Sequence, residues 1–323
     1  MRTIEEILSS GDYISGEAIS RELGITRAAV WKRIEALRAD GWEIESAGKR
    51  GYRLIAGDSL HSALWQGGLR TQTLGQGEVR CLQSVDSTNS EVKRMAAQGA
   101  PSGSLCVCEE QTSGRGRLGR TWVSPPGVGL WQSLLLRPRL SPEQAPLITL
   151  AAAMAMAQAV RETSGADVGI KWPNDLVCGG KKICGILLEM SADPDTIEYV
   201  VVGIGLNVRR GSIPPGLEAQ AACVEDIGQR LPKRREILCA YLEAMERLMQ
   251  RLEADGWPAI AEDYRAMSLT LGQAVQVIGA QSFTGTAEDI DGRGALVVRD
   301  SATGERRTVY SGDVSVRGLM GYV

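Results

Sequence analysis

Histidine is nearly absent from this sequence, and its scarcity excludes several classes of enzyme. His61 is the single histidine among 323 residues. Histidine-based zinc clusters, zinc proteases with a His-Glu-x-x-His helix and hydrolases with a histidine-dependent triad all need this side chain. Unless His61 itself serves, the sequence excludes all three classes.

Paired cysteines and long apolar runs are also missing. The 7 cysteines form no Cys-x-x-Cys pair, which is typical of reduced, mostly buried thiols. The most apolar segment, Leu147 to Ala157, is shorter than the roughly 18 residues that span a bilayer. The N-terminus lacks a cationic start followed by an apolar stretch. We therefore expect a cytoplasmic protein that does not interact with membranes.

An excess of positive charge is likewise missing from the chain as a whole. The 36 Lys and Arg against 39 Asp and Glu give a formal net charge of -3, so any nucleic-acid site must be local. With about 150 residues per domain as a guide, the length predicts two or three domains. The 43% of hydrophobic residues is enough for a sizeable core.

Residues 1–57 are typical of a winged helix-turn-helix domain. Apolar residues recur at helical spacing from Ile4 to Leu8, and a second helix is predicted at Glu17–Leu23. Gly24 breaks the chain before a third helix, Arg27–Arg38. Alternating residues between Trp42 and Leu54 predict a hairpin with a cationic turn. This arrangement places its last helix in a DNA major groove.

Basic residues are concentrated in the same domain. Between Arg27 and Arg53 there are seven Lys or Arg against four acids, where DNA phosphates would lie. The alternative is a protein-interaction module with a solvated charged face. The predicted DNA contacts are Thr26, Arg27, Trp31, Lys32, Lys49 and Arg50.

Residues 58–268 are predicted to form a mixed α/β domain, and the segment Gly57–Trp65 is predicted to link it to the first domain. Short β-type runs alternate with helical runs. The predicted elements are the strands Leu105–Glu109, Leu130–Leu136, Ile183–Met190 and Tyr199–Val208 and an Ala-rich helix, Pro142–Glu162.

Three arginines interleave with three glycines in the segment Gly114–Arg120. The segment satisfies Gly-x-Gly-x-x-Gly, but Pro125 and Pro126 follow it, so it cannot open the helix that a dinucleotide site requires. Amide and guanidinium donors on such a loop can converge on a phosphate or a carboxylate. The alternative is a solvated basic loop.

A second polar segment, Lys171–Asp175, follows a predicted strand end at Val168 and Ile170. Lys171 would hold an ammonium at the strand end, where open α/β sheets usually bind ligands. The alternative is an ordinary turn with a solvent-exposed lysine.

Residues 269–323 are predicted to be all β, as a small SH3-like barrel. Turn signals at Asp291-Gly292 and Thr303-Gly304 separate short alternating runs. The predicted strands are Ala274–Ile278, Ser282–Asp289, Ala295–Arg299, Arg306–Tyr310 and Val314–Arg317. The fold class is therefore a multidomain α+β protein.

Together these blocks resemble the biotin-protein ligase family. The matching blocks are Ser87-Thr88-Asn89, Gln111, Gly114–Arg120, Trp122, Lys171–Asp175, Lys182–Glu189 and Gly203–Asn207. Their order behind a winged helix is similar to the bifunctional bacterial form, which is both a biotin-[acetyl-CoA-carboxylase] ligase and a biotin operon repressor. Leu118 occupies the variable place of the family's Gly-Arg loop.

The resemblance implies a two-step reaction. The carboxylate of biotin attacks the α-phosphate of ATP, which is escorted by Mg²⁺, to give biotinyl-5'-AMP, and a lysine of a biotin carboxyl carrier protein then takes the biotinyl group. By this resemblance Arg117 and Lys171 are catalytic, and the protein itself holds no metal. The implied biotin contacts are Ser87, Thr88, Asn89, Gln111, Arg115, Gly116, Arg117, Lys171 and Gly185, and the implied adenylate contacts are Arg115, Arg117, Trp122, Asn174 and Asn207.

Operator DNA and a homodimer formed on adenylate binding complete the expected partners. Two other functions remain open: a lipoate or octanoate transferase on a similar fold, and a biotin-sensing repressor without turnover. Two local alternatives remain as well. In the first, Trp122 and Trp172 belong mainly to the core; in the second, Ser87-Thr88 caps a helix over Asn89–Ala97.

Overall fold

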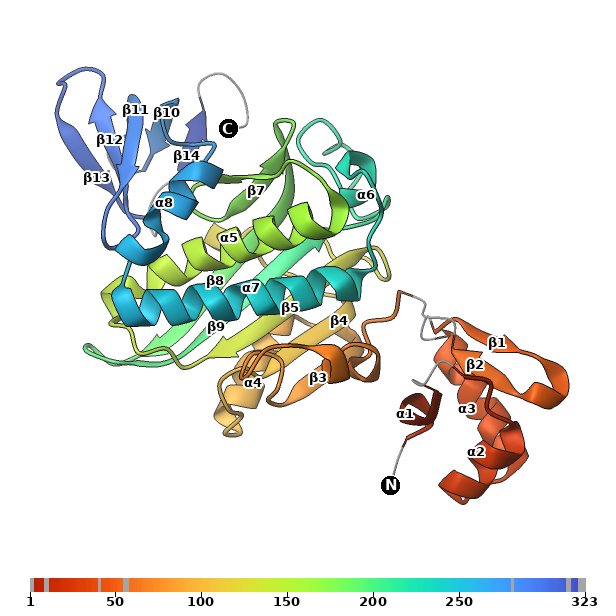
Figure 1. Cartoon of the computed structure of the whole chain (residues 1–323). Helices are drawn as coiled ribbons and strands as arrows, with labels where there is room; N and C mark the ends of the chain where they lie inside the picture. Colours follow the sequence, from red (N-terminus) through yellow and green to blue (C-terminus); the bar gives the residue numbers. More distant parts are fainter. Residues whose placement is uncertain are drawn as a thin grey trace. The chain divides into compact units, whose positions relative to one another are not determined.

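The computed structural model describes residues 3–8, 12–39, 42–54, 58–279, 282–311 and 315–318. The chain divides into two compact units, residues 1–69 with 233–236 and residues 70–232 with 237–323 (Figure 1). The first residue of the predicted linker, Gly57, lies outside the described residues, and the boundaries at 57 and 268 stay predictions. No helix in the described residues is long and apolar enough to cross a membrane.

The first unit is a winged helix-turn-helix, as predicted. Its elements are α1 (Ile4–Leu8), α2 (Gly16–Leu23), α3 (Arg27–Ala39), β1 (Ile44–Ser46) and β2 (Tyr52–Leu54). The Ser15 hydroxyl accepts the amide of Ala18 at 3.1 Å and so caps α2. The Thr26 hydroxyl accepts the amide of Ala29 at 3.2 Å at the start of α3. Both caps fix where the helices begin.

The single histidine has a structural place in this unit. The His61 ring packs edge-on against Trp42, with ring centroids 5.1 Å apart. Its Nδ1 accepts the amide of Ala63 at 3.3 Å and caps a short 3₁₀ turn, Ser62–Leu64. The one imidazole of the chain therefore packs against Trp42 and caps a turn.

A seven-stranded sheet forms the centre of the second unit. The strand order is β3 (Val79–Val85), β4 (Leu105–Gln111), β5 (Gly129–Leu136), β9 (Ile197–Asn207), β8 (Lys181–Ala192), β7 (Asp175–Cys178) and β6 (Gly169–Lys171). Only β3 and β4 pair in parallel among these strands as described. The four predicted strands correspond to β4, β5, β8 and β9.

Helices cover the sheet on both faces. Ser133 of β5 hydrogen-bonds to α4 (Thr88–Ala97), and its neighbour Gln132 lies beside Tyr241 of α7 (Arg234–Asp255). Because successive strand residues point to opposite faces, α4 and α7 lie on opposite sides. The Ala-rich α5 (Ala145–Ser164) runs across the same face as α7 (Figure 1).

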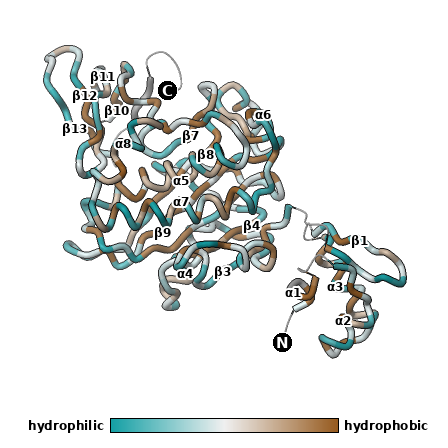
Figure 2. The backbone as a smooth tube through the Cα atoms, viewed as in Figure 1, coloured by the Kyte–Doolittle hydropathy of each residue, from teal (hydrophilic) through white to brown (hydrophobic). Residues whose placement is uncertain are grey.

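Hydropathy explains which strands are buried. Every residue of β5 is buried, and β9 is buried from Val200 onward. Much of β9 is coloured apolar in Figure 2, whereas the turn between β1 and β2 is hydrophilic. The sheet therefore provides a rigid wall for any site on its α4 face.

Five antiparallel strands form the SH3-like C-terminal region, in the order β13 (Arg306–Val309), β12 (Leu296–Asp300), β11 (Phe283–Ile290), β10 (Ala274–Ile278) and β14 (Ser315–Gly318). These match the predicted strands, although the predicted first residue of the last one, Val314, lies outside the described residues. In the described part of this region β13 and β14 are the edges of the sheet, so closure into a barrel stays a prediction. The sequence analysis did not identify α8 (Pro258–Met267), which precedes this sheet.

Candidate functional site

One cavity of about 560 Å³ lies on the α4 face of the central sheet, within the usual size of a small-molecule site. Its walls come from α4, the ends of β4 and β6, the Gly114–Arg120 loop, β8, β9 and the segment 212–221. The structure brings together in this cavity every residue predicted to contact biotin or the adenylate: Ser87, Thr88, Asn89, Gln111, Arg115, Gly116, Arg117, Trp122, Lys171, Asn174, Gly185 and Asn207. Their individual roles stay predictions.

A polar end of the cavity is built where α4 begins. The amide of Thr88 donates to Gln111 Oε1 at 2.9 Å, and Gln111 Nε2 donates to Ser124 Oγ at 2.8 Å. Ser87 occupies the N-cap position of α4, but its side chain makes no capping hydrogen bond. The capping alternative for Ser87 is therefore not supported, and a network of neutral hydrogen-bonding groups faces the ligand space.

Two glycines of β9 let the side chains opposite them approach the sheet. A Cβ at Gly203 would lie 2.0 Å from Asn89 Oδ1, and a Cβ at Gly205 would lie 2.3 Å from Trp122 Nε1. Any larger residue would displace Asn89 or Trp122. The indole Nε1 of Trp122 is buried without a hydrogen-bond partner in the described residues.

The Gly114–Arg120 loop supplies the cations of the other end. It contains a single 3₁₀ turn, Arg117–Gly119, and opens no α-helix, as the prolines after it predict. The Arg117 guanidinium donates to Asn174 Oδ1 at 2.9 Å and to the carbonyl oxygen of Ser311. Burial holds the pKa of Arg117 below its usual range, although the carboxylate of Asp175 partly offsets this.

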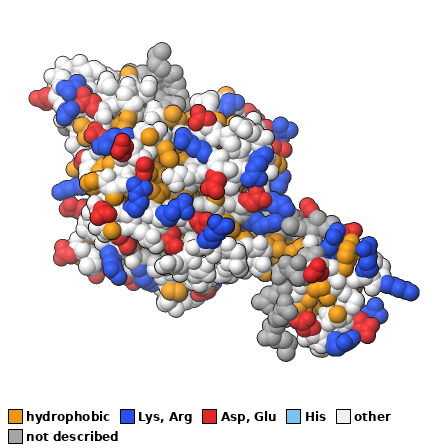
Figure 3. Space-filling model, in the orientation of Figure 1, with side chains coloured by type: hydrophobic (Ala, Val, Ile, Leu, Met, Phe, Trp, Pro, Cys, Tyr) orange, Lys and Arg blue, Asp and Glu red, His pale blue; other side chains and the backbone are white. Residues whose placement is uncertain are grey.

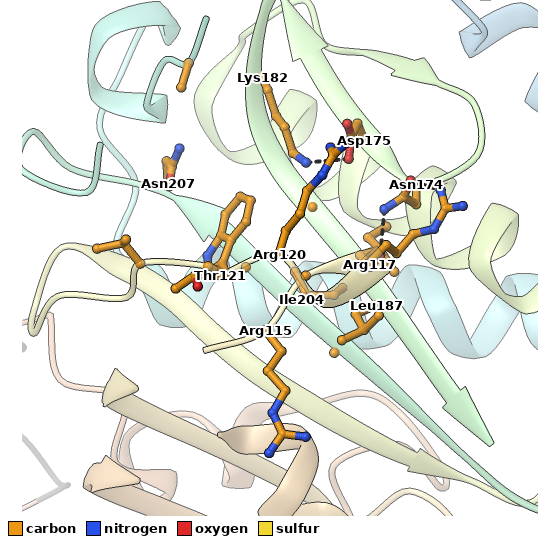
Figure 4. Close-up of a pocket in the computed structure, with 18 of the residues that line it drawn as sticks. Arg115, Arg117, Arg120, Thr121, Asn174, Asp175, Lys182, Leu187, Ile204 and Asn207 are labelled. Atoms are coloured by element: carbon orange, nitrogen blue, oxygen red, sulfur yellow. Dashed lines mark hydrogen bonds and ion pairs between the residues drawn. The ribbon is translucent and has the colours of Figure 1, made fainter. Parts of the chain in front are cut away.

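The three arginines of the loop do not converge on one point. In Figure 4 the Arg117 side chain extends toward Asn174, the Arg120 side chain extends toward Asp175, and Arg115 points to the opposite side. The loop therefore distributes its charge along the cavity, so that separate parts of an elongated anionic ligand can be reached.

Lys171 is buried at the end of β6, with 8% of its surface exposed. This burial contradicts the alternative of a solvent-exposed lysine. Its neighbour Trp172 is 2% exposed and donates from Nε1 to the carbonyl of Gly294 at 3.1 Å. Trp172 therefore packs in the core, as the alternative for this residue predicted, and it also contributes to the cavity wall, as Trp122 does.

The sequence analysis missed an ion pair in the same cavity. Lys182 Nζ lies 2.6 Å from Asp175 Oδ1 and 5.1 Å from the centroid of the Trp122 ring. The matching block Lys182–Glu189 named this lysine, but no sequence signal identified its partner. The segment 212–221 also lines the cavity, and its Pro214-Pro215-Gly216 turn gave no functional signal.

No group of three or more His, Cys, Asp or Glu side chains that could hold a metal occurs in the described residues. Asp175 is the one carboxylate among the described residues that line the cavity. Magnesium commonly binds through one or two carboxylates and the phosphates of a substrate. This one carboxylate therefore fits Mg²⁺ that arrives with the phosphates of a substrate.

The winged helix-turn-helix unit presents a separate candidate surface. Trp31 on α3 is 55% exposed, and Arg27, Lys32, Lys49 and Arg50 are exposed as well. Figure 3 shows Lys and Arg side chains projecting from the hairpin end of this unit.

Other cations of the unit are paired. Arg38 contacts Glu35 at 2.6 Å, and Arg53 contacts Glu45 at 2.7 Å. Four of the six predicted DNA contacts, Arg27, Lys32, Lys49 and Arg50, are therefore exposed cations. The other two, Thr26 and Trp31, carry no charge.

Three family models match the chain. They are an HTH domain over residues 1–53, the Biotin/lipoate A/B protein ligase family over residues 81–207, and the Biotin protein ligase C terminal domain over residues 270–317. The models therefore follow one another along the chain in the order that the two units and the C-terminal sheet have in the structure.

Similar proteins match over most of their length. The chain is 34% identical over 312 residues to "Bifunctional ligase/repressor BirA" of Bacillus spizizenii, covering 95% of each chain. It is 36% identical over 269 residues to "Biotin--[acetyl-CoA-carboxylase] ligase" of Mycobacterium tuberculosis, covering 80% of this chain and 97% of that one.

A solved structure, "Biotin protein ligase from Aquifex aeolicus in complex with biotin and ATP", matches with a TM-score of 0.66 and 27% identity. The match covers 75% of this chain and 99% of that chain.

Proposed function

The chain belongs to the biotin protein ligase family, and from this we propose that it forms biotinyl-5'-AMP from biotin and ATP, transfers biotin to a lysine of a biotin carboxyl carrier protein, and represses biotin biosynthesis genes. The observation that carries the proposal is a single cavity with a neutral, hydrogen-bonding end and a cationic end. These two ends suit the uncharged ureido head of biotin and the phosphates of ATP.

The first step brings two anions together, because a carboxylate attacks a phosphate. Fixed positive charge where they meet is therefore the main catalytic need. Arg117, Lys171 and Lys182 line the cavity and supply that charge. Mg²⁺ enters with ATP as part of the substrate, and pyrophosphate leaves.

Recognition of the two ligands uses different walls. Ser87, Thr88, Asn89 and Gln111 hydrogen-bond the biotin head, where an unpaired ureido group would be costly. Trp122, Asn174 and Asn207 contact the adenylate. The buried Nε1 of Trp122 has no hydrogen-bond partner in the described residues, and a buried indole donor usually has one. This supports the assignment of Trp122 to the adenylate.

The second step needs a base. The acceptor lysine attacks the carbonyl carbon of biotinyl-AMP as a free amine, AMP leaves, and one proton must be removed. Asp175 is the carboxylate that lines the cavity in the described residues, and it takes this role. Its Oδ1 lies 2.6 Å from Lys182 Nζ.

Repression uses the exposed cations of the winged helix-turn-helix unit. Because twofold operators are usually read by dimers, the adenylate-bound form is a homodimer, and biotinyl-AMP acts as both intermediate and corepressor. Operator binding at fixed protein and salt should therefore be tighter with biotinyl-AMP than with biotin or without ligand. Equal affinity under all three conditions would leave the unit as a constitutive DNA anchor.

The enzymatic part is tested with biotin, MgATP and an acceptor domain. We expect pyrophosphate release and the mass increase of a biotinylated acceptor. Lipoate in place of biotin tests the transferase alternative, and preference for lipoate would support it. Binding of biotin without pyrophosphate release would favour the sensor without turnover.

A further inference from the structure

A chain of hydrogen bonds runs from the biotin end of the cavity to a carboxylate outside it. Glu189 of β8 does not line the cavity, but its Oε2 accepts Asn89 Nδ2 at 2.7 Å. Ser133 Oγ lies 2.5 Å from Asn89 Oδ1 and 2.7 Å from Thr88 Oγ1. Three links therefore join Glu189 to Thr88, which lines the cavity.

The orientation of the Asn89 amide is fixed by what surrounds it. Its Nδ2 faces the Glu189 carboxylate at 2.7 Å and the carbonyl oxygen of Leu187 at 3.4 Å, and both of these groups only accept hydrogen bonds. Nδ2 must therefore point toward them. Oδ1 then faces Ser133 Oγ and must accept its proton.

Counting the hydroxyl protons gives the direction of the remaining links. Ser133 and Thr88 have one hydroxyl proton each, but three close oxygen–oxygen contacts each need a proton. These contacts join Ser133 Oγ to Asn89 Oδ1, Ser133 Oγ to Thr88 Oγ1, and Thr88 Oγ1 to Gln111 Oε1 at 3.1 Å. Ser133 gives its proton to Asn89. Thr88 then gives its proton to Ser133 across the shorter 2.7 Å contact. Thr88 Oγ1 is left with lone pairs only.

We propose that Glu189 is a positioning residue that sets the direction of this chain, so that Thr88 Oγ1 presents an acceptor to the cavity and selects ligands with an N–H donor at that point. The inference rests on the proposed function, because the ureido group of biotin supplies such donors. A neutral glutamine at position 189 could donate as well as accept, and the Asn89 amide could then adopt either orientation.

The surroundings of Glu189 keep it an acceptor. Burial alone would raise the pKa of Glu189, but hydrogen bonds from Lys93 and Asn89 hold it below its ordinary value. Lys93 Nζ lies 2.5 Å from Oε1, so each carboxylate oxygen has a separate partner. The ionised group therefore accepts from Asn89 throughout the neutral pH range.

The test compares Glu189→Gln with the wild type in pyrophosphate release, varying biotin and MgATP separately. We expect the KM for biotin to rise about tenfold, from the loss of one charge-assisted link. The kcat at saturating biotin and the KM for MgATP should stay within about twofold, because the cationic end is untouched. Glu198→Gln is the matched control, since Glu198 accepts the Ser191 hydroxyl at 2.7 Å without joining the chain.

A double-mutant cycle distinguishes positioning from a general structural role. If Glu189 acts through Thr88, Thr88→Val removes the group that the chain orients, and adding Glu189→Gln should raise the biotin KM no further. N-methylation of the biotin ureido nitrogens should weaken binding to the wild type more than to Glu189→Gln. Additive effects, or an unchanged biotin KM in Glu189→Gln, would overturn the inference.

Two further outcomes are separable. If Glu189→Gln does not fold, Ser133→Ala interrupts the same chain, and its additivity with Thr88→Val would overturn the inference equally. A wild-type protein that releases no pyrophosphate with biotin would overturn the proposed function, whereas an active wild type with an unaffected Glu189→Gln variant would overturn only the role of Glu189.

Discussion

Two turns of this chain combine glycine with arginine or lysine, but they differ in how far their cations are buried. The loop Gly114–Arg120 lines a cavity and holds the half-buried Arg117 against fixed neutral acceptors. In the hairpin turn Ala47–Gly51 both Lys49 and Arg50 are exposed, and the Arg50 guanidinium lies 4.4 Å from the centroid of the Tyr13 ring. The same local composition thus gives a ligand clamp in one unit and an open charged surface in the other, and burial decides which.

Burial also determines what each turn can recognise. A desolvated guanidinium with a fixed direction distinguishes the shape and position of an anion. Exposed cations attract phosphates through a field that salt screens. The first turn should therefore show large effects of single substitutions and the second small, salt-dependent ones.

Arg117→Ala or Lys171→Ala should show the largest effect. The first removes a half-buried cation and the second a buried one. A charge-assisted contact is worth about 1.5 to 3 kcal/mol, so the rate of biotinyl-AMP formation should fall more than tenfold while the fold survives. Pyrophosphate release and thermal unfolding measure the two outcomes. Arg139→Ala removes an exposed arginine of the same unit and is the control. Unchanged rates in both variants would mean that the active site lies elsewhere.

Support from the sheet is the second difference between the turns. A Cβ at Gly205 would meet Trp122 Nε1 at 2.3 Å, whereas nothing lies within 4 Å of a Cβ at Gly48 in the hairpin turn. Gly205→Ala should displace the indole and raise the KM for MgATP about tenfold, because overpacking costs about 1 to 3 kcal/mol. Gly292→Ala, where a Cβ also meets nothing, is the control. An unchanged KM for MgATP would show that Trp122 does not contact the nucleotide.

Much of the fold could be predicted because its signals are local. Alternation and turn residues identified the C-terminal strands, and Gly24 and Thr26 marked the break between α2 and α3. β6 was predicted only as a strand end at Val168 and Ile170, and β7 was not predicted, because runs of three and four residues are too short for a period to appear. Helix α7 packs against the sheet, and the sequence analysis did not identify it.

The site could be predicted only as a set of segments. The motifs identified the Gly-Arg loop and Lys171 as parts of the site. They did not identify the contact from Arg117 to Ser311, which joins residues 194 positions apart. The contact from Asn89 to Glu189 spans 100 positions. The Asn89–Glu189 contact depends on the sheet order, in which β9 and then β8 follow β5. The Arg117–Ser311 contact depends on how the Gly-Arg loop meets the C-terminal region. No local pattern encodes either contact.

Lys49→Ala should have the smallest effect per protomer and gives the sharpest test of the hairpin turn. Each phosphate contact contributes about 0.9 to the slope of log affinity against log salt, so losing one lowers operator affinity about fivefold per protomer near 0.15 M salt. The slope itself should fall by about 1 per protomer, equally for all DNA sequences. Titrations of operator and unrelated DNA at several salt concentrations measure both quantities, with Arg139→Ala as the control of equal charge. A drop in affinity without a change of slope would mean that Lys49 reads bases or supports the fold, and the contrast between the two turns would then fail.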